Sequence, residues 1–250
     1  MSDAPPVMLH CFAHAGAGVS AFHRWPAHLG DGVQPVPHLL PGRARRRREP
    51  RVTGREALLA GLLEGFCSPA GPYVLYGHSL GALVAYTLAR ALHEAGLPTP
   101  ALLAVGACPP PDAPSPLSDA CRESAERLRE LLGAHDEAAG DLWQRSVLPV
   151  LRDDLLLADA LRAAARRPPA SGTAFRVPVL AVAGAGDPLA PPAVTAGWHR
   201  WTAGRVITRT LPGDHFFVRE RPLPRLLGRA CRVLRRPPAR PAPATTGGHT

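Results

Sequence analysis

Short apolar runs alternate along the chain with longer segments in which apolar residues recur every three or four positions. The short runs have the length and composition of buried strands, and the longer segments have the periodicity of amphipathic helices. The predicted strands are Met8–Phe12, Val33–Val36, Tyr73–Tyr76, Ala101–Gly106, Val179–Ala183 and Val206–Thr210. The predicted helices are Gly54–Phe66, Ser79–Ala95, Pro192–Trp201 and Phe217–Leu234. Strands that alternate with helices in this way predict an α/β fold with a doubly wound, mostly parallel central sheet flanked by helices.

The strand pattern stops between Cys108 and Phe175. Proline-rich segments open and close this stretch, and between them lie helical patterns at about 120–132, 138–151 and 153–165. Because the stretch follows a predicted strand, we expect a helical lid insertion over about 109–170, above the carboxyl ends of the strands. A separate small helical bundle is the alternative interpretation.

The length of 250 residues suits one large domain with a substantial core. We expect a single α/β domain over 1–236 and a disordered Pro- and Ala-rich tail over 237–250. No apolar stretch approaches the roughly 18 residues of a membrane-spanning helix, and the N-terminus lacks the basic segment of a secretory signal. The five cysteines are scattered without metal-type spacing, so the sequence predicts neither metal nor cofactor. We expect a monomer in the cytoplasm.

The formal net charge is +9, and all 29 basic residues are arginine. The densest run is Arg43–Arg48. Guanidinium groups bind phosphates well, but no recognised nucleic-acid module accompanies this run, so we expect no nucleic-acid binding. An acidic protein partner fits the basic surface better. A solvated loop is the plainer alternative.

The motif with the most chemical content is Gly77–Gly81, which has the form G-x-S-x-G and lies between a predicted strand and a predicted helix. This context is that of a nucleophile elbow, a sharp turn that exposes a serine hydroxyl. Ser79 is therefore the candidate nucleophile. The alternative is a Gly-Ser turn with no chemistry.

A serine nucleophile needs an imidazole base, and the imidazole needs a carboxylate that fixes its tautomer. Asp187 follows the predicted strand ending at Ala183, and His215 lies in the loop after the last predicted strand. The order Ser, Asp, His is that of α/β-hydrolase triads. Asp214 is a rival carboxylate, but a direct neighbour of His215 rarely meets its Nδ1. A turn-forming Asp187 and a surface His215 are the plainer alternatives.

Backbone amides near Ser79 are candidates for an oxyanion hole. The amide of Leu80 opens the helix after the serine, and the second amide is expected from the glycine loop after the first strand. We favour Ala15 there, with Ala13 or His14 as alternatives.

Taken together, these motifs resemble those of the type II thioesterases, α/β-hydrolases that accompany polyketide synthases and nonribosomal peptide synthetases. The resemblance extends to about Arg235 and includes a P-G-R-x-x-R-x-x-E-P pattern and a lid-helix motif. Its segments beyond the elbow are Cys11–Gly18, Phe22, Trp25, Leu40–Arg43, Arg46, Glu49–Pro50, Leu148–Asp154, Gly184–Pro188 and Pro212–Phe217. The chain departs from the family at Ala13, Ala17 and Leu161, where a proline, a glycine and an aromatic residue are usual.

The resemblance implies hydrolysis of acyl groups stalled on the phosphopantetheine arm of acyl or peptidyl carrier proteins. The partner would be such a carrier protein, usually acidic, and Arg43–Arg48 is a candidate docking face unless Arg43 pairs with Glu49. A carboxylesterase or lipase-like hydrolase, a chain-releasing thioesterase and a silent carrier-binding module are the alternatives.

Overall fold

A six-stranded sheet forms the centre of the computed structural model, which describes residues 5–66, 71–133, 143–167 and 172–235. The strands are β1 (Val7–Phe12), β2 (Val33–His38), β3 (Tyr73–His78), β4 (Leu102–Gly106), β5 (Val179–Gly184) and β6 (Val206–Leu211). Their order is β2-β1-β3-β4-β5-β6, and every neighbouring pair runs parallel. The predicted α/β class and the predicted strands are confirmed, with ends that differ by one or two residues.

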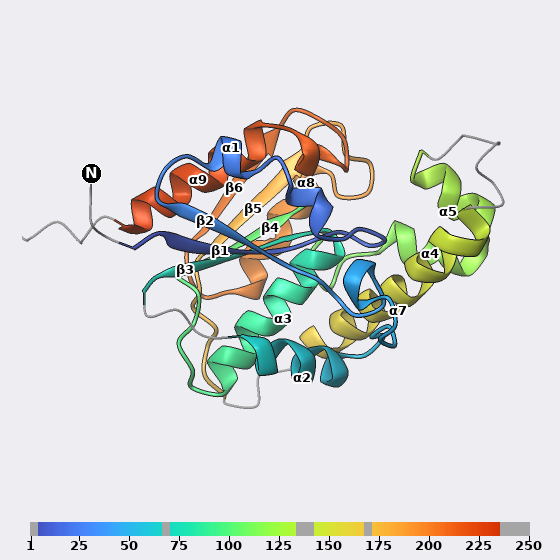
Figure 1. Cartoon of the computed structure of the whole chain (residues 1–250), viewed down its shortest axis with the longest axis horizontal. Coiled ribbons are helices and arrows are strands. Elements are labelled where there is room, and N and C mark those ends of the chain that lie inside the picture. The colour runs from blue at the N-terminus through green and yellow to red at the C-terminus, as the bar shows by residue number, and fades with distance from the viewer. Residues whose placement is uncertain (1–4, 67–70, 134–142, 168–171, 236–250) are drawn as a thin grey trace, which may run out of the picture.

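Helices cover both faces of this sheet (Figure 1). On one face lie α2 (Arg55–Gly65) and α3 (Leu80–Glu94), and on the other lie α1 (Pro26–Leu29) and α9 (Pro222–Arg235). The short helix α8 (Pro192–Thr195) packs near β5 and β6. Successive strand residues point to opposite faces, so Leu75 packs in the core on the α3 side while Val74 and Tyr76 pack in the core on the α9 side.

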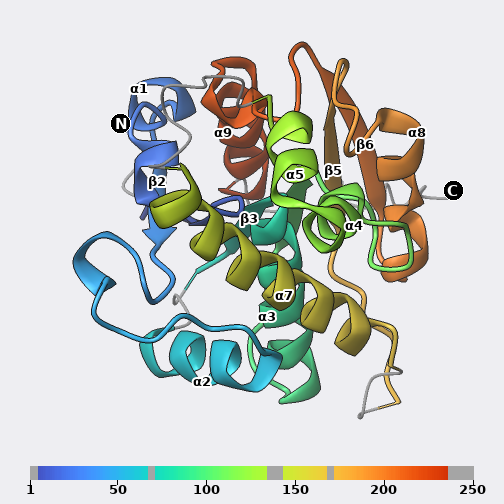
Figure 2. The same ribbon diagram turned by 90° about the vertical axis from the view of Figure 1, so that its right-hand side faces the viewer.

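The segment between β4 and β5 forms a helical insertion, which we call the lid, with helices α4 (Pro116–Glu123), α5 (Ala125–Leu131) and α7 (Leu148–Ala165). Figure 2 shows α7 crossing in front of α3, with α4 and α5 beside it. The lid has a small apolar core of its own, which includes Trp143 and Leu148. Nevertheless Leu157 and Leu161 of α7 belong to the main core beneath, so the lid is not a separate bundle.

Several helix boundaries differ from the sequence prediction. The predicted helix 120–132 is broken at Ser124, which caps α5 by accepting a hydrogen bond from the amide of Arg127. The predicted break near residue 152 is wrong, because α7 is continuous across it. The predicted helix 192–201 changes to a 3-10 helix at Ala196, and the predicted helix 217–234 begins as a 3-10 turn before α9 starts at Pro222.

Some predictions fall outside the described residues, namely the start of the helix predicted at 138–151 and the tail 237–250. The division into a domain over 1–236 and a tail also stays a prediction. Within the described part of the chain, no helix is both long and apolar enough to span a membrane.

Candidate active site

Ser79 lies at the tight turn between β3 and α3. Its φ of 54° and ψ of −117° lie in a region that residues with a Cβ rarely adopt, so the turn holds strain at this serine. The amide of Ser79 donates to the carbonyl of Gly106, 2.8 Å away on the neighbouring β4. The turn therefore fixes the backbone and leaves the side chain half-buried at the carboxyl edge of the sheet.

The glycines on either side of Ser79 are required by close backbone contacts. A Cβ on Gly77 would overlap the carbonyl of Gly81, and a Cβ on Gly81 would overlap the carbonyl of Phe12. The strand and the helix thus approach each other more closely than any other residue type permits.

The structure brings together Ser79, His215 and Asp187 from three segments that follow three strands. His215 Nε2 lies 3.2 Å from Ser79 Oγ, and His215 Nδ1 lies 2.9 and 3.1 Å from the two carboxylate oxygens of Asp187. His215 and Asp187 are buried. This is the spatial order in which an imidazole takes a proton from a serine while a carboxylate orients it.

Asp187 is itself held by the backbone of its loop. Its Oδ1 accepts hydrogen bonds from the amides of Leu189 and Ala190, at 2.8 and 3.0 Å. These amides fix the carboxylate so that it faces Nδ1 of His215. The rival Asp214 instead accepts a hydrogen bond from the amide of Phe216 at 2.7 Å.

His78 and Tyr76 of β3 hold the backbone of His215 through a chain of hydrogen bonds that the sequence did not predict. His78 Nε2 lies 2.7 Å from the carbonyl oxygen of His215 and so donates to it, and Tyr76 OH then donates to the unprotonated Nδ1, also at 2.7 Å. Burial lowers the pKa of His78 well below 6.5 and raises the pKa of Tyr76, which keeps both groups neutral. The sequence signal was the alternation of Tyr76 and His78 along one strand face.

The glycine loop after β1 lies against Ser79, where Ala15 lines the same cavity as Ser79 and His215. Among the described residues, the amide of Ala15 donates no hydrogen bond to the protein. Leu80 opens α3, and the first amides of a helix have no acceptor within it. Ala13 and His14 are both buried, and His14 packs edge-on against His78 and Phe216.

A buried ion pair holds the glycine loop in place. Asp154 of α7 accepts a hydrogen bond from the amide of Gly16 at 2.6 Å and forms a short ion pair with Arg43. Arg43 also donates to the carbonyl of Ala17 at 2.7 Å. Burial raises the pKa of Asp154, while the Arg43 guanidinium opposes that rise. The alternative pairing of Arg43 with Glu49 is wrong, because Glu49 pairs with Arg46 at 2.5 Å.

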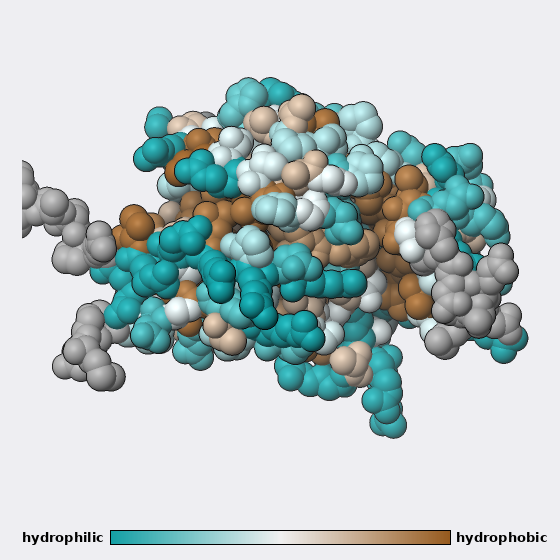
Figure 3. Space-filling view, turned by 90° about the horizontal axis from the view of Figure 1, so that it is seen from above, coloured by the Kyte–Doolittle hydropathy of each residue, from teal (hydrophilic) through white to brown (hydrophobic). Residues whose placement is uncertain are grey.

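The cavity at Ser79 lies between the sheet edge and the lid. Its walls include Leu155 and Ala158 of α7, Leu117 of α4 and Leu189, and an adjoining cavity is lined by Leu128 and Leu151. Seen from above in Figure 3, hydrophobic residues gather between the body of the molecule and the lid side at the right. The site thus presents a serine and an imidazole to a mostly apolar chamber.

The chain matches the model of a known protein family over most of its length. Residues 8–232 match the model of the thioesterase domain. The chain belongs to the thioesterase family. The resemblance to thioesterases that the sequence motifs indicated is therefore confirmed at the level of the family, as is the expectation of an enzyme that hydrolyses thioesters.

Individual thioesterases are similar over most of their length. Thioesterase PikA5 of Streptomyces venezuelae is 34% identical over 221 residues, which cover 86% of this chain and 76% of PikA5. Among solved structures, the RedJ thioesterase of the prodiginine biosynthetic pathway in Streptomyces coelicolor is 34% identical with a TM-score of 0.73, covering 90% of this chain and 91% of RedJ. YbtT, a type II thioesterase from the yersiniabactin pathway, is 27% identical with a TM-score of 0.72, covering 93% and 94% of the two chains.

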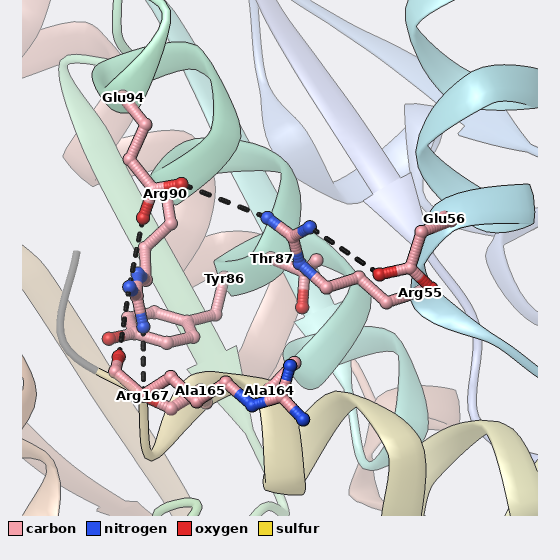
Figure 4. Close-up of a pocket in the computed structure, with 9 residues that line it drawn as sticks. All are labelled: Arg55, Glu56, Tyr86, Thr87, Arg90, Glu94, Ala164, Ala165 and Arg167. Carbon is pink, nitrogen blue, oxygen red and sulfur yellow. Dashed lines mark hydrogen bonds and ion pairs between the residues drawn. The ribbon is translucent and has the colours of Figure 1, made fainter. Parts of the chain in front are cut away.

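A second pocket of this thioesterase lies between α2, α3 and the end of α7, and Figure 4 shows its lining. Four of its charged side chains are paired within the protein, since Glu94 lies 2.9 Å from Arg90 and 3.8 Å from Arg55, and Glu56 lies 3.9 Å from Arg55. Arg90 also donates to the carbonyl of Ala165 at 2.8 Å. These contacts tie α3 to the end of the lid helix, and the pocket contains none of the three side chains predicted for catalysis.

Proposed function

We propose that this chain is a type II thioesterase that removes acyl groups from the phosphopantetheine arm of carrier proteins in polyketide or nonribosomal peptide biosynthesis. The observation that carries the proposal is the 3.2 Å contact of Ser79 Oγ with His215 Nε2, inside an apolar cavity covered by the lid. Similarity to RedJ of the prodiginine pathway and to YbtT of the yersiniabactin pathway supports the choice of substrate.

In the proposed reaction, His215 Nε2 accepts the proton of Ser79 as Oγ attacks the thioester carbonyl. The oxyanion of the tetrahedral intermediate is stabilised by the amides of Leu80 and Ala15. The C–S bond then breaks, the thiol leaves with the proton from His215, and the acyl group remains on Ser79. Water, deprotonated by His215, then attacks this ester. The C–O bond to Ser79 breaks, His215 returns the proton to Oγ, and the free acid leaves. Asp187 keeps the proton on Nδ1 throughout.

The proposed partner is an acidic carrier protein. Arg45, Arg47 and Arg48 are exposed on the loop after β2, and these three side chains remain available for docking. Arg43 and Arg46 are held in contacts within the protein and are assigned to the structure of the loop.

The test of the proposed function is the release of thiol from acyl-pantetheine and acyl-carrier substrates. Ser79→Ala and His215→Ala are each expected to lower turnover at least a thousandfold, because either change removes the nucleophile or its base. Ser20→Ala, at an exposed serine that does not line this cavity, serves as the control and keeps most of the activity. Near wild-type turnover by Ser79→Ala protein would refute the proposal.

A matched pair of substrates tests the preference for thioesters. We expect the thioester to be cleaved faster than the oxygen ester of the same acyl group, because a thiol is a better leaving group. A clear preference for the oxygen ester would favour the carboxylesterase alternative.

A further inference from the structure

The cavity at Ser79 contains one permanently charged side chain among its described lining residues, Arg162 of the lid helix. Leu155, Ala158 and Arg162 follow one another at spacings of three and four residues, so they lie on one face of α7. At 1.5 Å per residue, Arg162 lies roughly 10 Å along the helix from Leu155. The cavity therefore has an apolar wall that leads to a guanidinium group.

Arg162 is buried, with 8% of its surface exposed. It pairs with no carboxylate among the residues that the structure describes. Its Nη1 donates to the carbonyls of Pro110 and Ala113, at 3.2 and 3.4 Å. Its Nε is buried without a hydrogen-bond partner. Nη2 likewise has no described protein acceptor, and this N–H group can donate a charge-assisted hydrogen bond to a carboxylate.

Two other arginines that contact the lid helix each pair with a carboxylate. Arg43, which reaches the same lid helix, pairs with Asp154, and Arg90 pairs with Glu94. A buried cation without a counter-charge is unfavourable unless a ligand supplies one. Arg162 therefore differs from these arginines in lacking a protein anion.

The start of α4 adds to the positive potential in the same cavity. Ser115, Pro116 and Leu117 line it, so the N-terminal end of this helix, with its partial positive charge, faces the chamber. No aspartate or glutamate is found among the described lining residues.

We propose that Arg162 binds the terminal carboxylate of the acyl group, so that the enzyme prefers acyl thioesters of dicarboxylic acids. This inference rests on the proposed function and specifies its substrate class. The thioester carbonyl lies at Ser79, the methylene groups lie along Leu155 and Ala158, and the distal carboxylate accepts a hydrogen bond from Nη2 of Arg162. Hydrolysis converts the thioester and one water into a dicarboxylic acid and the free thiol.

Shape-matched pairs of pantetheine thioesters test this proposal on the wild-type protein. Malonyl is paired with 3-methylbutanoyl, succinyl with 4-methylpentanoyl and glutaryl with 5-methylhexanoyl, because an isopropyl group has nearly the shape of a carboxylate. At one or more of these lengths we expect kcat/KM to be about ten- to a hundredfold higher for the charged member, as for a charge-assisted hydrogen-bonded pair. If the neutral members are cleaved equally fast or faster at all three lengths, the proposal is overturned, although the proposed thioesterase function stands.

Variants separate substrate recognition from a structural role. Arg162→Gln is expected to abolish the preference for the charged member while sparing the neutral one. Arg166→Gln is the matched control, since Arg166 is exposed and donates to Pro111 of the same proline-rich loop at 3.0 and 3.2 Å. This control is expected to keep the preference. An equal fall for both substrates in Arg162→Gln would show that Arg162 only holds the loop.

A measurement without variants covers the case in which Arg162→Gln fails to fold. Free succinate and glutarate are expected to inhibit the wild-type enzyme more strongly than 4-methylpentanoate does. Stronger inhibition by the monocarboxylate would contradict the proposal.

Discussion

His78 shows how a single neutral side chain positions the proposed base. It donates to the backbone carbonyl of His215 and accepts from Tyr76 OH, so the imidazole of residue 78 connects β3 to the loop of His215. The pKa of Tyr76 is raised by burial, which keeps the phenol protonated as the donor that His78 requires. The position of His215 thus depends on the buried side chains of Tyr76 and His78, which do not line the cavity at Ser79.

Removal of the phenol tests this arrangement. Tyr76→Phe leaves the buried Nδ1 of His78 without a donor, and we expect the free energy of unfolding to fall by about 1–3 kcal/mol. Denaturant titration measures the loss. Tyr86→Phe is the control, because its hydroxyl donates a long hydrogen bond of 3.3 Å to the carbonyl of Trp201 and lines a pocket open to solvent. Equal losses in the two variants would contradict this account.

At the residue scale, the positions of Ser79, Asp187 and His215 could be expected from the sequence, because each follows a predicted strand in a short recognisable motif. Their catalytic roles stay a proposal. The partner of Arg43 could not be expected, since Asp154 lies 111 residues further along the chain and both Glu49 and Asp153 compete as candidates. The contacts of Arg162 with Pro110 and Ala113 could not be expected either, because they depend on how the lid helix packs against the loop after β4.

At the scale of elements, α7 connects the lid to the glycine loop after β1. Asp154 holds the amide of Gly16, which has a φ of +77° and lies directly after Ala15. A Cβ on Gly16 would lie 3.1 Å from Leu151 of the same helix, so the loop and the lid helix are in close contact. A change in α7 therefore reaches the proposed oxyanion amide of Ala15.

We expect Asp154→Asn to lower kcat by about ten- to a thousandfold, because it loosens the amide at Ala15. The same change leaves Arg43 buried without a counter-charge, which costs about 3–5 kcal/mol of unfolding free energy. Steady-state kinetics and denaturant titration measure the two effects. Asp153→Asn is the matched control, since Asp153 pairs with Arg51 at 2.5 Å in a partly exposed position. An unchanged kcat in Asp154→Asn would show that Asp154 does not position the amide of Ala15.

Strands β1, β3, β4 and β5 were predictable because parallel strands buried on both faces appear as short continuous apolar runs. The bounds of the lid helices were harder to predict from the sequence. Arg152 and Asp153 interrupt the apolar pattern and suggest a break, yet they lie on the outer side of a continuous helix. Ser124 ends α4 and caps α5. The periodicity of apolar residues alone does not show that these are two helices.

At the scale of the whole molecule, folding keeps a group of histidines neutral. The pKa values of His10, His14 and His38 are lowered to about 4, chiefly by burial, and the pKa of His78 is lowered well below 6.5. In the unfolded chain these imidazoles take up protons as the pH falls through about 6.5, while in the folded chain they do not until about pH 4. Acid therefore favours the unfolded state.

We expect the free energy of unfolding to fall steeply between pH 6.5 and pH 4.5. Each such histidine adds a slope of about 1.4 kcal/mol per pH unit. Denaturant titrations at a series of pH values measure the slope, and His10→Gln is expected to reduce it by about one histidine's share. A stability that stays constant from pH 7 to pH 5 would contradict the expectation.

The central claim concerns an acyl group carried on Ser79, and rapid mixing with an acyl-pantetheine substrate tests it most directly. Peptide mass spectrometry of the quenched wild-type enzyme is expected to find the acyl mass on the peptide that contains Ser79, together with a burst of thiol no larger than the enzyme concentration. Continued thiol release by Ser79→Ala protein, or an acyl group found on a different residue, would contradict the account.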